Sequence, residues 1–333
     1  MDLNFFKGKR VLITGATGLI GSHITNKLLS LDNIKVIVLG RSKTKLENIF
    51  CDYVQTENID CLEHDISQPL PSTLGKVDYI FHAASPISSE TIKTKPLDVI
   101  NSNLAGAVNC LEYLKKQGFG KMVIFSSATV YSVDEPSHVA IESVTCQADC
   151  IGAPNAPYSE SKRMVEVISN AYHKQYNVDT LVARFSYVYG YSQNVAQTAF
   201  YEFVGRALNG DNIVMNKSGL SRRDNIYVDD AVEGLLHLCH VGINGEAYNI
   251  SSNGDKGNYI AVDEMAEIIA NIANRLIDGN NVKVEFKETG GTRKEGLRLS
   301  NERIKSTGWN VLTSMEEGIL KTMKQFLDRR QRI

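Results

Sequence analysis

The fold of this chain is decided near its N-terminus, by the stretch Arg10-Val11-Leu12-Ile13-Thr14-Gly15-Ala16-Thr17-Gly18-Leu19-Ile20-Gly21. The apolar run before Gly15 contains β-branched residues and predicts a strand, whereas the apolar spacing after Gly18 predicts a helix. Glycines at every third position allow a tight turn, a close approach of the backbone to a pyrophosphate, and tight packing of the helix on the strand. Because these glycines join a first strand to a helix, they predict a dinucleotide-binding turn.

The same alternation of strand and helix recurs over the first half of the chain. Further apolar strands are predicted at 35–39, 78–82, 121–125 and 179–183, and helices at 19–31, 97–116 and 159–175. Strands that are apolar throughout and alternate with helices indicate a parallel sheet that is covered on both faces. Since crossovers are right-handed, the expected fold class is α/β, with a Rossmann-type doubly wound parallel sheet.

The pattern changes after residue 184. Helices are predicted at 194–209, 229–240, 262–276 and 315–330, short strands at 212–215 and 282–286, and loops at 251–257 and 290–292. Such short elements between polar, Gly-rich loops predict a smaller mixed α/β domain. We therefore expect a dinucleotide-binding domain in residues 1–184 and a second, C-terminal domain mainly in 185–333, with part of 225–250 returning to the first.

The bulk composition favours a small-molecule partner. Of the 333 residues, 43% are hydrophobic and 22% are charged, and the formal net charge is -2. Basic residues are spread along the chain, so we expect no nucleic-acid partner and no attraction to a membrane surface. The N-terminal residues lack the apolar segment of a signal peptide, and no later apolar run is long enough to span a bilayer, so a cytoplasmic location is expected.

The six cysteines predict neither a disulfide framework nor a metal site. They are scattered along the chain, which is usual for a protein of a reducing compartment. Cys146 and Cys150 lie near His138, but this spacing lacks a second pair of ligands, so free thiols are favoured over zinc. We therefore expect no bound metal.

The residues after the second strand bear on the choice of cofactor. An acidic residue at this place would hold the ribose 2′-hydroxyl of NAD, but the chain has Gly40 and Arg41, with Lys43 and Lys45 beyond. A guanidinium binds a 2′-phosphate through charge-assisted hydrogen bonds. The sequence thus favours NADP, with NAD possible; the alternative is that Arg41 is solvated or stacks on adenine.

Polar and small residues also follow other strands, where open α/β sheets bind ligands. Asp65 could accept a hydrogen bond from an adenine amino group, with Ile66 beside it. The small Ala83 and Ala84 would let the backbone approach a cofactor. His82, which precedes them, is interpreted as a buried core histidine, because no neighbour in the sequence requires a base.

Tyr158 and Lys162 are spaced for one face of a helix. Residues four apart lie one turn apart, and a neighbouring ammonium favours the phenolate form of tyrosine. The pair could therefore transfer a proton to or from a sugar hydroxyl, although the same spacing occurs by chance on solvated helix faces. Ser127, at the end of the strand predicted at 121–125, could share that proton across a bound sugar.

These motifs together resemble one enzyme family. Gly15-x-x-Gly18-x-x-Gly21, Ser127, Tyr158-x-x-x-Lys162 and Arg223-Asp224-Asn225-Ile226-Tyr227-Val228-Asp229-Asp230 occur in this order and span nearly the whole chain. The chain resembles the extended short-chain dehydrogenases/reductases of the nucleotide-sugar epimerase/dehydratase family. The resemblance implies that Tyr158 transfers the proton, that Lys162 lowers its pKa and binds the nicotinamide ribose, and that Ser127 holds the sugar oxygen. Hydride would pass between the cofactor and a sugar carbon, most often C4.

The resemblance also implies binding residues and an assembly. A nucleotide sugar would bind mainly to residues 185–333, and a homodimer would form through the helices at 97–116 and 159–175, which could otherwise simply pack on the sheet. Arg293 is the alternative to Arg298 as a second phosphate contact. Taken together, the residues predicted to bind the cofactor are Gly15, Thr17, Gly18, Leu19, Ile20, Gly21, Arg41, Asp65, Ile66, Ala83, Ala84, Ser85, Asn103, Tyr158 and Lys162, and those predicted to bind the substrate are Ser127, Tyr187, Arg223 and Arg298.

Departures from the family pattern bear on the reaction. Family dehydratases carry Asp-Glu after the catalytic hydroxyl and decarboxylases usually carry Ser-Glu, whereas this chain has Ala128 and Thr129. The loop instead resembles that of UDP-galactose 4-epimerases, although Arg41, Tyr187 and Tyr191 differ from them. We therefore expect an NAD(P)-dependent epimerase or oxidoreductase acting at C4 of a nucleotide sugar. The alternative is an NADPH-dependent 4-keto sugar reductase; a 4,6-dehydratase, a decarboxylase and a non-catalytic NADP sensor are less favoured.

Overall fold

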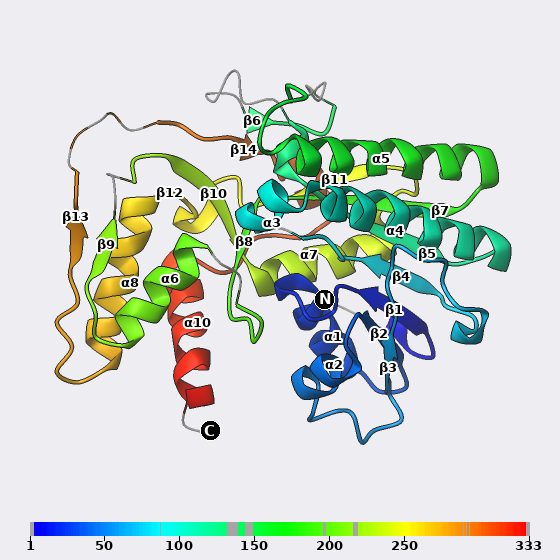
Figure 1. Ribbon diagram of the computed structural model, residues 1–333, viewed down its shortest axis with the longest axis horizontal. Helices are drawn as coiled ribbons and strands as arrows, with labels where there is room; N and C mark the ends of the chain where they lie inside the picture. The colour runs from blue at the N-terminus through cyan, green and yellow to red at the C-terminus, as the bar shows by residue number, and fades with distance from the viewer. Residues whose placement is uncertain are drawn as a thin grey trace.

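The computed structural model describes residues 3–86, 88–131, 139–143, 149–195, 198–215, 219–288, 290, 292 and 294–330. Its central layer is a parallel sheet of seven strands in the order β3-β2-β1-β4-β5-β7-β11 (Figure 1). The predicted α/β class and Rossmann-type sheet are thus confirmed. The strands of this sheet are β1 (Arg10–Thr14), β2 (Lys35–Gly40), β3 (Ile59–Glu63), β4 (Tyr79–His82), β5 (Lys121–Ser127), β7 (Asp179–Phe185) and β11 (Ala247–Ile250).

Helices cover both faces of the sheet, and the side chains of β1 alternate between them. Val11 and Ile13 belong to the core that includes residues of α1 (Leu19–Leu29), α2 (Lys43–Ile49) and α7 (Val228–Val241). Leu12 belongs to the core that includes residues of α4 (Pro96–Gln117) and α5 (Ala156–Tyr176). A strand buried on both faces must be apolar on both, which explains the continuous apolar runs of the sequence.

The helices α4 and α5, which follow β4 and precede β7, have well-defined ends. Each has a proline in its first turn, where the missing N–H breaks no hydrogen bond. Gly118 ends α4 with a φ of 80°, and Asn177 ends α5 with a φ of 53°, both in the left-handed region that closes helices. The two helices pack against each other, and α5 carries Tyr158 and Lys162.

The sequence prediction lacked two strands of this sheet, β3 and β11. Each lies at an edge of the sheet, and β3 exposes the charged side chains of Asp60 and Glu63. Strand β3 reads Ile-Asp-Cys-Leu-Glu, and β11 is only 4 residues long, so neither produces an apolar run. Helix α7, which packs against α1, and β11 bring residues 228–250 back to the sheet.

A second group of elements lies beside the sheet, at the left of Figure 1. It contains a three-stranded sheet in the order β12-β10-β8 and a parallel pair of β9 with β13. The strands are β8 (Tyr187–Tyr189), β9 (Ile213–Met215), β10 (Arg222–Tyr227), β12 (Tyr259–Ala261) and β13 (Val284–Phe286), and the helices are α6 (Ala199–Leu208), α8 (Val262–Leu276) and α10 (Met315–Arg330).

Short elements complete the described chain. A two-stranded pair joins β6 to β14, far apart in sequence. Among the described residues, no helix is both long and apolar enough to cross a bilayer. The short elements are β6 (Val139–Ala140), β14 (Arg298–Leu299), α3 (Ser89–Thr94), α9 (Glu302–Lys305), and the 3-10 turns η1 (Asn4–Phe6), η2 (Ser72–Leu74), η3 (Ala128–Val130) and η4 (Asp255–Gly257).

One predicted helix begins later than expected. The helix predicted from residue 194 begins at Ala199, because the residues before it bridge to α2 instead. Asn194 Oδ1 accepts a hydrogen bond from Lys45 Nζ at 3.0 Å, and Gln193 Nε2 donates to Ile49 O at 3.4 Å. Side-chain bonds to a distant helix are tertiary contacts that helical periodicity does not encode.

Candidate active site

The turn between β1 and α1 is shaped by its glycines. Gly15 has a φ of 65°, and a Cβ atom there would lie 2.6 Å from Ala84 N and 2.7 Å from Ala83 C. A Cβ atom at Gly21 would collide with the carbonyl oxygen of Gly15. These close approaches allow only glycine at 15 and 21 without a shift of the backbone.

This turn also presents backbone donors. Gly18 is the N-cap of α1, and Ser22 N donates to Gly18 O at 2.9 Å as the first bond of the helix. The amides of Leu19, Ile20 and Gly21 therefore lie at the helix N-terminus without helical acceptors, next to Thr17. Such a cradle of amides fits the pyrophosphate of a dinucleotide.

Two buried polar atoms support the same fit. Ser85 Oγ, just after β4, and Asn103 Oδ1, on α4, have no hydrogen-bond partner among the described residues. Asn103 is held in place because its Nδ2 donates to Ser161 Oγ at 2.8 Å. A buried polar atom without a partner costs free energy, so both atoms are suited to meet a ligand. The residues predicted to bind a cofactor after β4 and on α4 thus fit a bound dinucleotide.

The residues predicted to bind the adenosine end follow adjacent strands. Arg41 is exposed after β2, and Asp65 and Ile66 follow β3, which pairs with β2. A hydrogen bond from Ser67 N, at 2.9 Å, lowers the pKa of Asp65, and the charge of Arg41 lowers it further. Arg41 therefore lies close enough to an ionised Asp65 to interact with it.

His82 ends β4 and is buried. Its Nδ1 lies 3.0 Å from Thr14 Oγ1, which also accepts a hydrogen bond from Ala84 N at 3.2 Å. Burial lowers the pKa of His82 to about 3, and the charge of Lys162 lowers it as well. His82 is therefore a neutral core histidine, although its Nε2 lacks a partner among the described residues.

The structure brings Ser127, Tyr158 and Lys162 together. Ser127 ends β5, and its side chain lies close enough to Tyr158, in the first turn of α5, to lower the pKa of the phenol. Lys162, one turn further along α5, is buried, and its Nζ lies 5.7 Å from the centroid of the Tyr158 ring. That Nζ donates to Phe125 O at 2.7 Å, which ties the lysine to the strand that carries Ser127.

The electrostatics of this group differ from the sequence prediction. Burial raises the pKa of Tyr158, and the neighbouring Ser127 side chain offsets this only in part, whereas a lowered pKa was expected. The cause is the burial of the phenol. Lys162 donates to Phe125 O and is itself perturbed, because burial lowers its pKa to about 7, against the charge of Glu166, which raises it. Both groups thus lose solvation together.

No carboxylate follows Ser127 in the turn that leaves β5. Ala128, Thr129 and Val130 form η3, and Thr129 N donates to Ser127 Oγ at 3.2 Å. The side chain of Thr129 is exposed. The first turn after the strand therefore offers no acid or base beyond Ser127 itself.

The predicted substrate residues lie on neighbouring strands. The guanidinium of Arg223, on β10, lies 5.3 Å from the ring centroid of Tyr187, on the parallel strand β8. Arg298, on β14, instead lies 5.0 Å from the ring of Tyr259, on β12. The structure therefore joins Tyr187 with Arg223 and places Arg298 on a separate tyrosine. Arg293, the alternative to Arg298, lies outside the described residues, as do Cys146 and His138 of the disfavoured zinc site.

Comparison with known proteins identifies the family. Residues 11–251 match the sequence model of the NAD dependent epimerase/dehydratase family. The chain belongs to this epimerase/dehydratase family.

Relatives and structural neighbours of this chain have names that give several activities. It is 30% identical to UDP-glucuronic acid decarboxylase 1 of Danio rerio, over 96% of this chain and 72% of the relative. It is 29% identical to UDP-glucuronic acid decarboxylase 5 of Arabidopsis thaliana, over 93% and 87%. A UDP-glucose 4-epimerase of Thermotoga maritima, crystallised with UDP-glucose, shares its fold with a TM-score of 0.79 at 24% identity, over 96% of this chain and 99% of that one.

The sequence assigned no role to Asp224, an acid that joins the strands carrying Arg223 and Arg298. Asp224, next to Arg223, is buried and accepts hydrogen bonds from Leu299 N at 3.1 Å and from Ser252 Oγ at 2.6 Å. It thereby ties β10 to β14, which carries Arg298. Burial raises the pKa of Asp224 to about 6, although these hydrogen bonds lower it.

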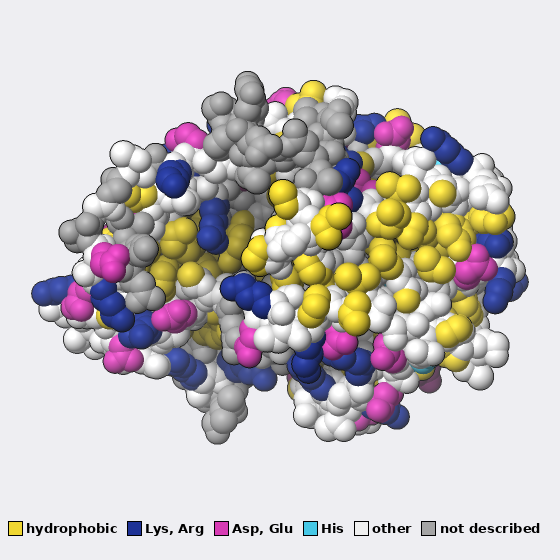
Figure 2. All heavy atoms as spheres, turned by 45° about the horizontal axis from the view of Figure 1, so that its top comes forward, with side chains coloured by type: hydrophobic (Ala, Val, Ile, Leu, Met, Phe, Trp, Pro, Cys, Tyr) yellow, Lys and Arg dark blue, Asp and Glu magenta, His cyan; other side chains and the backbone are white. Residues whose placement is uncertain are grey.

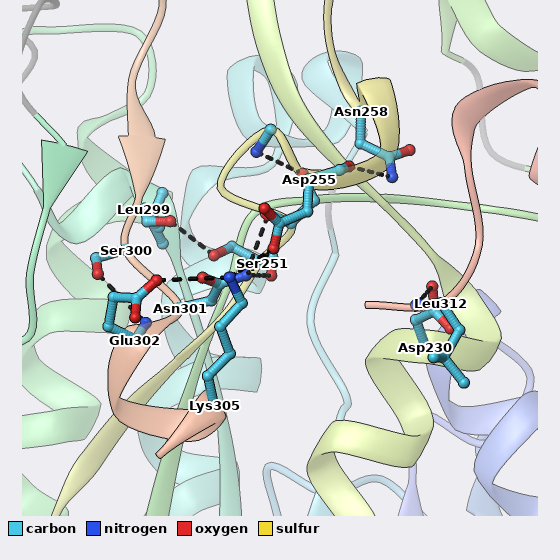
Figure 3. Close-up of polar contacts among 12 residues, drawn as sticks. Asp230, Ser251, Asp255, Asn258, Leu299, Ser300, Asn301, Glu302, Lys305 and Leu312 are labelled. Atoms are coloured by element: carbon cyan, nitrogen blue, oxygen red, sulfur yellow. Dashed lines mark hydrogen bonds and ion pairs between the residues drawn. The ribbon is translucent and has the colours of Figure 1, made fainter. Parts of the chain in front are cut away.

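A polar cluster after β11 fixes the same region (Figure 3). Ser251 Oγ donates to Leu299 O at 2.8 Å, and Asn301 Nδ2 donates to Ser251 O at 3.2 Å. Lys305 and Asp255 form an ion pair at 2.7 Å. The polar run at 251–257 predicted a loop, but its partners lie about 50 residues later, and no local spacing could reveal them.

Proposed function

We propose that this protein acts at C4 of a nucleotide-activated sugar, with 4-epimerisation as its reaction. The observation that carries the proposal is the group of Ser127, Tyr158 and Lys162 where β5 meets α5, with no carboxylate in the turn after Ser127. This group can move one proton beside a redox step at carbon but lacks a second acid and base for elimination.

Each side chain of the group has a separate task. Ser127 holds the C4 oxygen, and Tyr158 takes the proton from that oxygen and later returns it. Lys162, buried and tied to Phe125 O, places a cation beside the phenol and can hold a ribose hydroxyl. The nicotinamide, when bound by the Gly15–Gly21 cradle, supplies the hydride chemistry. Arg223 over Tyr187 is suited to bind the diphosphate of the substrate.

The named relatives do not set the reaction. The relatives from Arabidopsis thaliana and Danio rerio are UDP-glucuronic acid decarboxylases, at 29% and 30% identity. The Ser-Glu pair implied for decarboxylases and the Asp-Glu pair implied for dehydratases are replaced here by Ala128 and Thr129. Neither side chain titrates near neutral pH, so decarboxylation and dehydration are less favoured. A non-catalytic sensor is also less favoured, because it needs only the dinucleotide site.

A second candidate is reduction of a 4-keto nucleotide sugar with exchanged NADPH, which Arg41 favours. Purified protein can be tested with a panel of UDP-, GDP-, CDP- and dTDP-sugars that includes UDP-glucuronic acid. Stoichiometric nicotinamide in the purified protein together with 4-epimerised product supports the epimerase. Protein that is purified without bound nicotinamide cofactor and that consumes added NADPH supports the reductase. Pentose formation from UDP-glucuronic acid, or no turnover of any sugar, contradicts both.

The cofactor preference depends on Arg41. We propose that its guanidinium binds the 2′-phosphate of NADP. A pocket of about 330 Å³ borders the same turn, and its lining residues include Ser42, Lys45 and Arg329 but no carboxylate. Arg41 is not among these lining residues, and a phosphate that extended from Arg41 into the pocket would meet Lys45 and Arg329.

Arg41→Ala is expected to weaken NADP binding by about tenfold and to leave NAD binding nearly unchanged, because one charge-assisted hydrogen bond is lost. Titration of each purified variant with both cofactors measures this. Lys43→Ala, which removes a neighbouring exposed cation, is the matched control. NAD affinity equal to or above that of NADP, unaffected by Arg41→Ala, would show that the 2′-phosphate assignment is wrong.

We also propose a homodimer through α4 and α5. Hydrophobic side chains gather over these two helices (Figure 2), where Leu97, Met164 and Val167 are 70%, 48% and 61% exposed. Burial of these apolar side chains against a second copy would lower the free energy of the assembly. Two helices from each copy would then form a four-helix interface.

Val167→Glu is expected to shift the protein toward a monomer, because it places a charge in the proposed interface. Sedimentation or light scattering across a dilution series measures the assembly. Ile243→Glu, at an apolar side chain that is 62% exposed elsewhere, is the control and should leave the mass unchanged. A wild-type protein that is monomeric at all concentrations would contradict the dimer.

A further inference from the structure

A buried ion pair lies behind the group of Ser127, Tyr158 and Lys162. Glu166, on α5, binds Arg184, on β7, with Nε 3.0 Å from Oε1 and Nη2 2.7 Å from Oε2. The two side chains are only 14% and 8% exposed. A buried ion pair usually contributes little net stability, because the desolvation of both charges offsets their attraction. Its presence here therefore calls for a role besides stability.

The pair contacts the elements that carry the catalytic group. Glu166 lies one helical turn after Lys162 on α5. Ser126, which precedes Ser127 on β5, donates its hydroxyl hydrogen to Glu166 Oε1. The carboxylate therefore links the helix of Tyr158 and Lys162 to the strand of Ser127.

Arg184 also donates hydrogen bonds to residues other than Glu166. Arg184 Nη1 donates to Tyr131 OH at 2.7 Å and to Glu142 O at 3.2 Å. The hydroxyl of Tyr131 donates in turn to Asn249 Oδ1 on β11, at 2.7 Å. Every nitrogen of the guanidinium thus has an acceptor, so its orientation toward Glu166 is set by several elements.

The charges around Lys162 make this pair important. The titratable groups near Lys162 are Tyr158 and Glu166 on its own helix and His82 on β4, with Arg184 and Tyr131 behind Glu166. His82 is neutral, because burial lowers its pKa to about 3. Burial lowers the pKa of Lys162 to about 7, and the charge of Glu166 opposes that effect.

We propose that Glu166 and Arg184 form a positioning pair that sets the charge state of Lys162 and, through it, proton transfer at Tyr158. This inference rests on the function proposed above. Glu166 stabilises the ammonium, and Arg184 limits that stabilisation because it neutralises the carboxylate. Neither residue touches the substrate in this proposal.

The proposal predicts shifts of opposite sign. Glu166→Gln leaves the Arg184 cation unbalanced near Lys162, so the pKa of Lys162 falls. Arg184→Gln leaves the Glu166 anion unbalanced, so the pKa of Lys162 rises. The double variant removes both charges, so the pKa of Lys162 should return close to its wild-type value. A purely structural role would not produce opposite shifts, because both single variants loosen the same contact.

The first readout is the pH dependence of kcat/KM in the full-length enzyme. If the ammonium is required, activity falls as pH rises through the pKa of Lys162. We expect this alkaline limb to move down by about 1 pH unit in Glu166→Gln and up by about 1 pH unit in Arg184→Gln. In the double variant it should return to within about 0.5 unit of wild type.

The second readout needs no substrate. The Lys162 resonance in protein that carries ε-¹³C-lysine, identified by its loss in Lys162→Gln, reports the lysine titration directly. Opposite shifts in the two single variants support the positioning pair even if no nucleotide sugar is turned over. The absence of turnover contradicts only the proposed function. An unchanged titration, or shifts of the same sign, would overturn the pair. Thermal melting checks folding. If only one single variant folds, its shift must have the predicted sign and must be reversed in the double variant.

Discussion

Tyr158→Phe is expected to reduce turnover by about 10²- to 10⁴-fold, the usual contribution of one positioned acid or base. The phenol lies beside Ser127, and Lys162 Nζ lies over its ring, so Tyr158 is the proton carrier of the proposed reaction. The phenyl ring of the variant preserves the packing of α5 but cannot exchange a proton. Cofactor binding and folding should therefore be retained while activity is lost.

The measurement is steady-state turnover of the best nucleotide sugar found in the panel, with cofactor titration of the same preparations. Tyr176→Phe is the matched control, because it makes the same change at the exposed C-terminal end of the same helix. It should keep near wild-type activity. Turnover of Tyr158→Phe within about threefold of the control would remove Tyr158 from the proton-transfer role.

Gly15→Ala is expected to destabilise the protein by about 2–5 kcal/mol and to abolish measurable cofactor binding. A left-handed backbone costs a non-glycine residue about 1–2 kcal/mol, and forced overpacking costs about 1–3 kcal/mol more. At Gly15, φ is 65° and the added Cβ would press on the backbone of Ala83 and Ala84. Relief of that contact moves the end of β4 away from the turn and opens the amide cradle.

Gly75→Ala separates the two costs of this change. Gly75 has a φ of 72°, but a Cβ atom there would meet nothing within 4 Å. Its ψ of -173° places it in a region that essentially only glycine adopts, so Gly75→Ala should lose only the backbone part, about 1–3 kcal/mol, and keep its cofactor affinity. Urea unfolding and cofactor titration of both variants measure the difference. If Gly15→Ala matches Gly75→Ala in both measurements, the close approach at Ala83 and Ala84 is not what requires the glycine.

The sequence predicted the central elements of the fold better than its edges. Strands such as β1 and β5 are buried on both faces, so their apolar runs are visible without any knowledge of neighbours. Strand β3 and strand β11 each have one free edge and weaker patterns, and both were missed. The late start of α6 at Ala199 has the same cause, since bonds to α2 hold the preceding segment.

By itself the sequence determined the fold class, the glycine turn and the spacing of Tyr158 with Lys162, because each depends on residues close together in the chain. Only the tertiary structure decided the electrostatics of the site. The burial that raises the pKa of Tyr158 and lowers that of Lys162, and the pairing of Glu166 with Arg184, depend on contacts between α5, β5 and β7. Desolvation and charge pairing depend on distance in space, which spacing along the chain does not record.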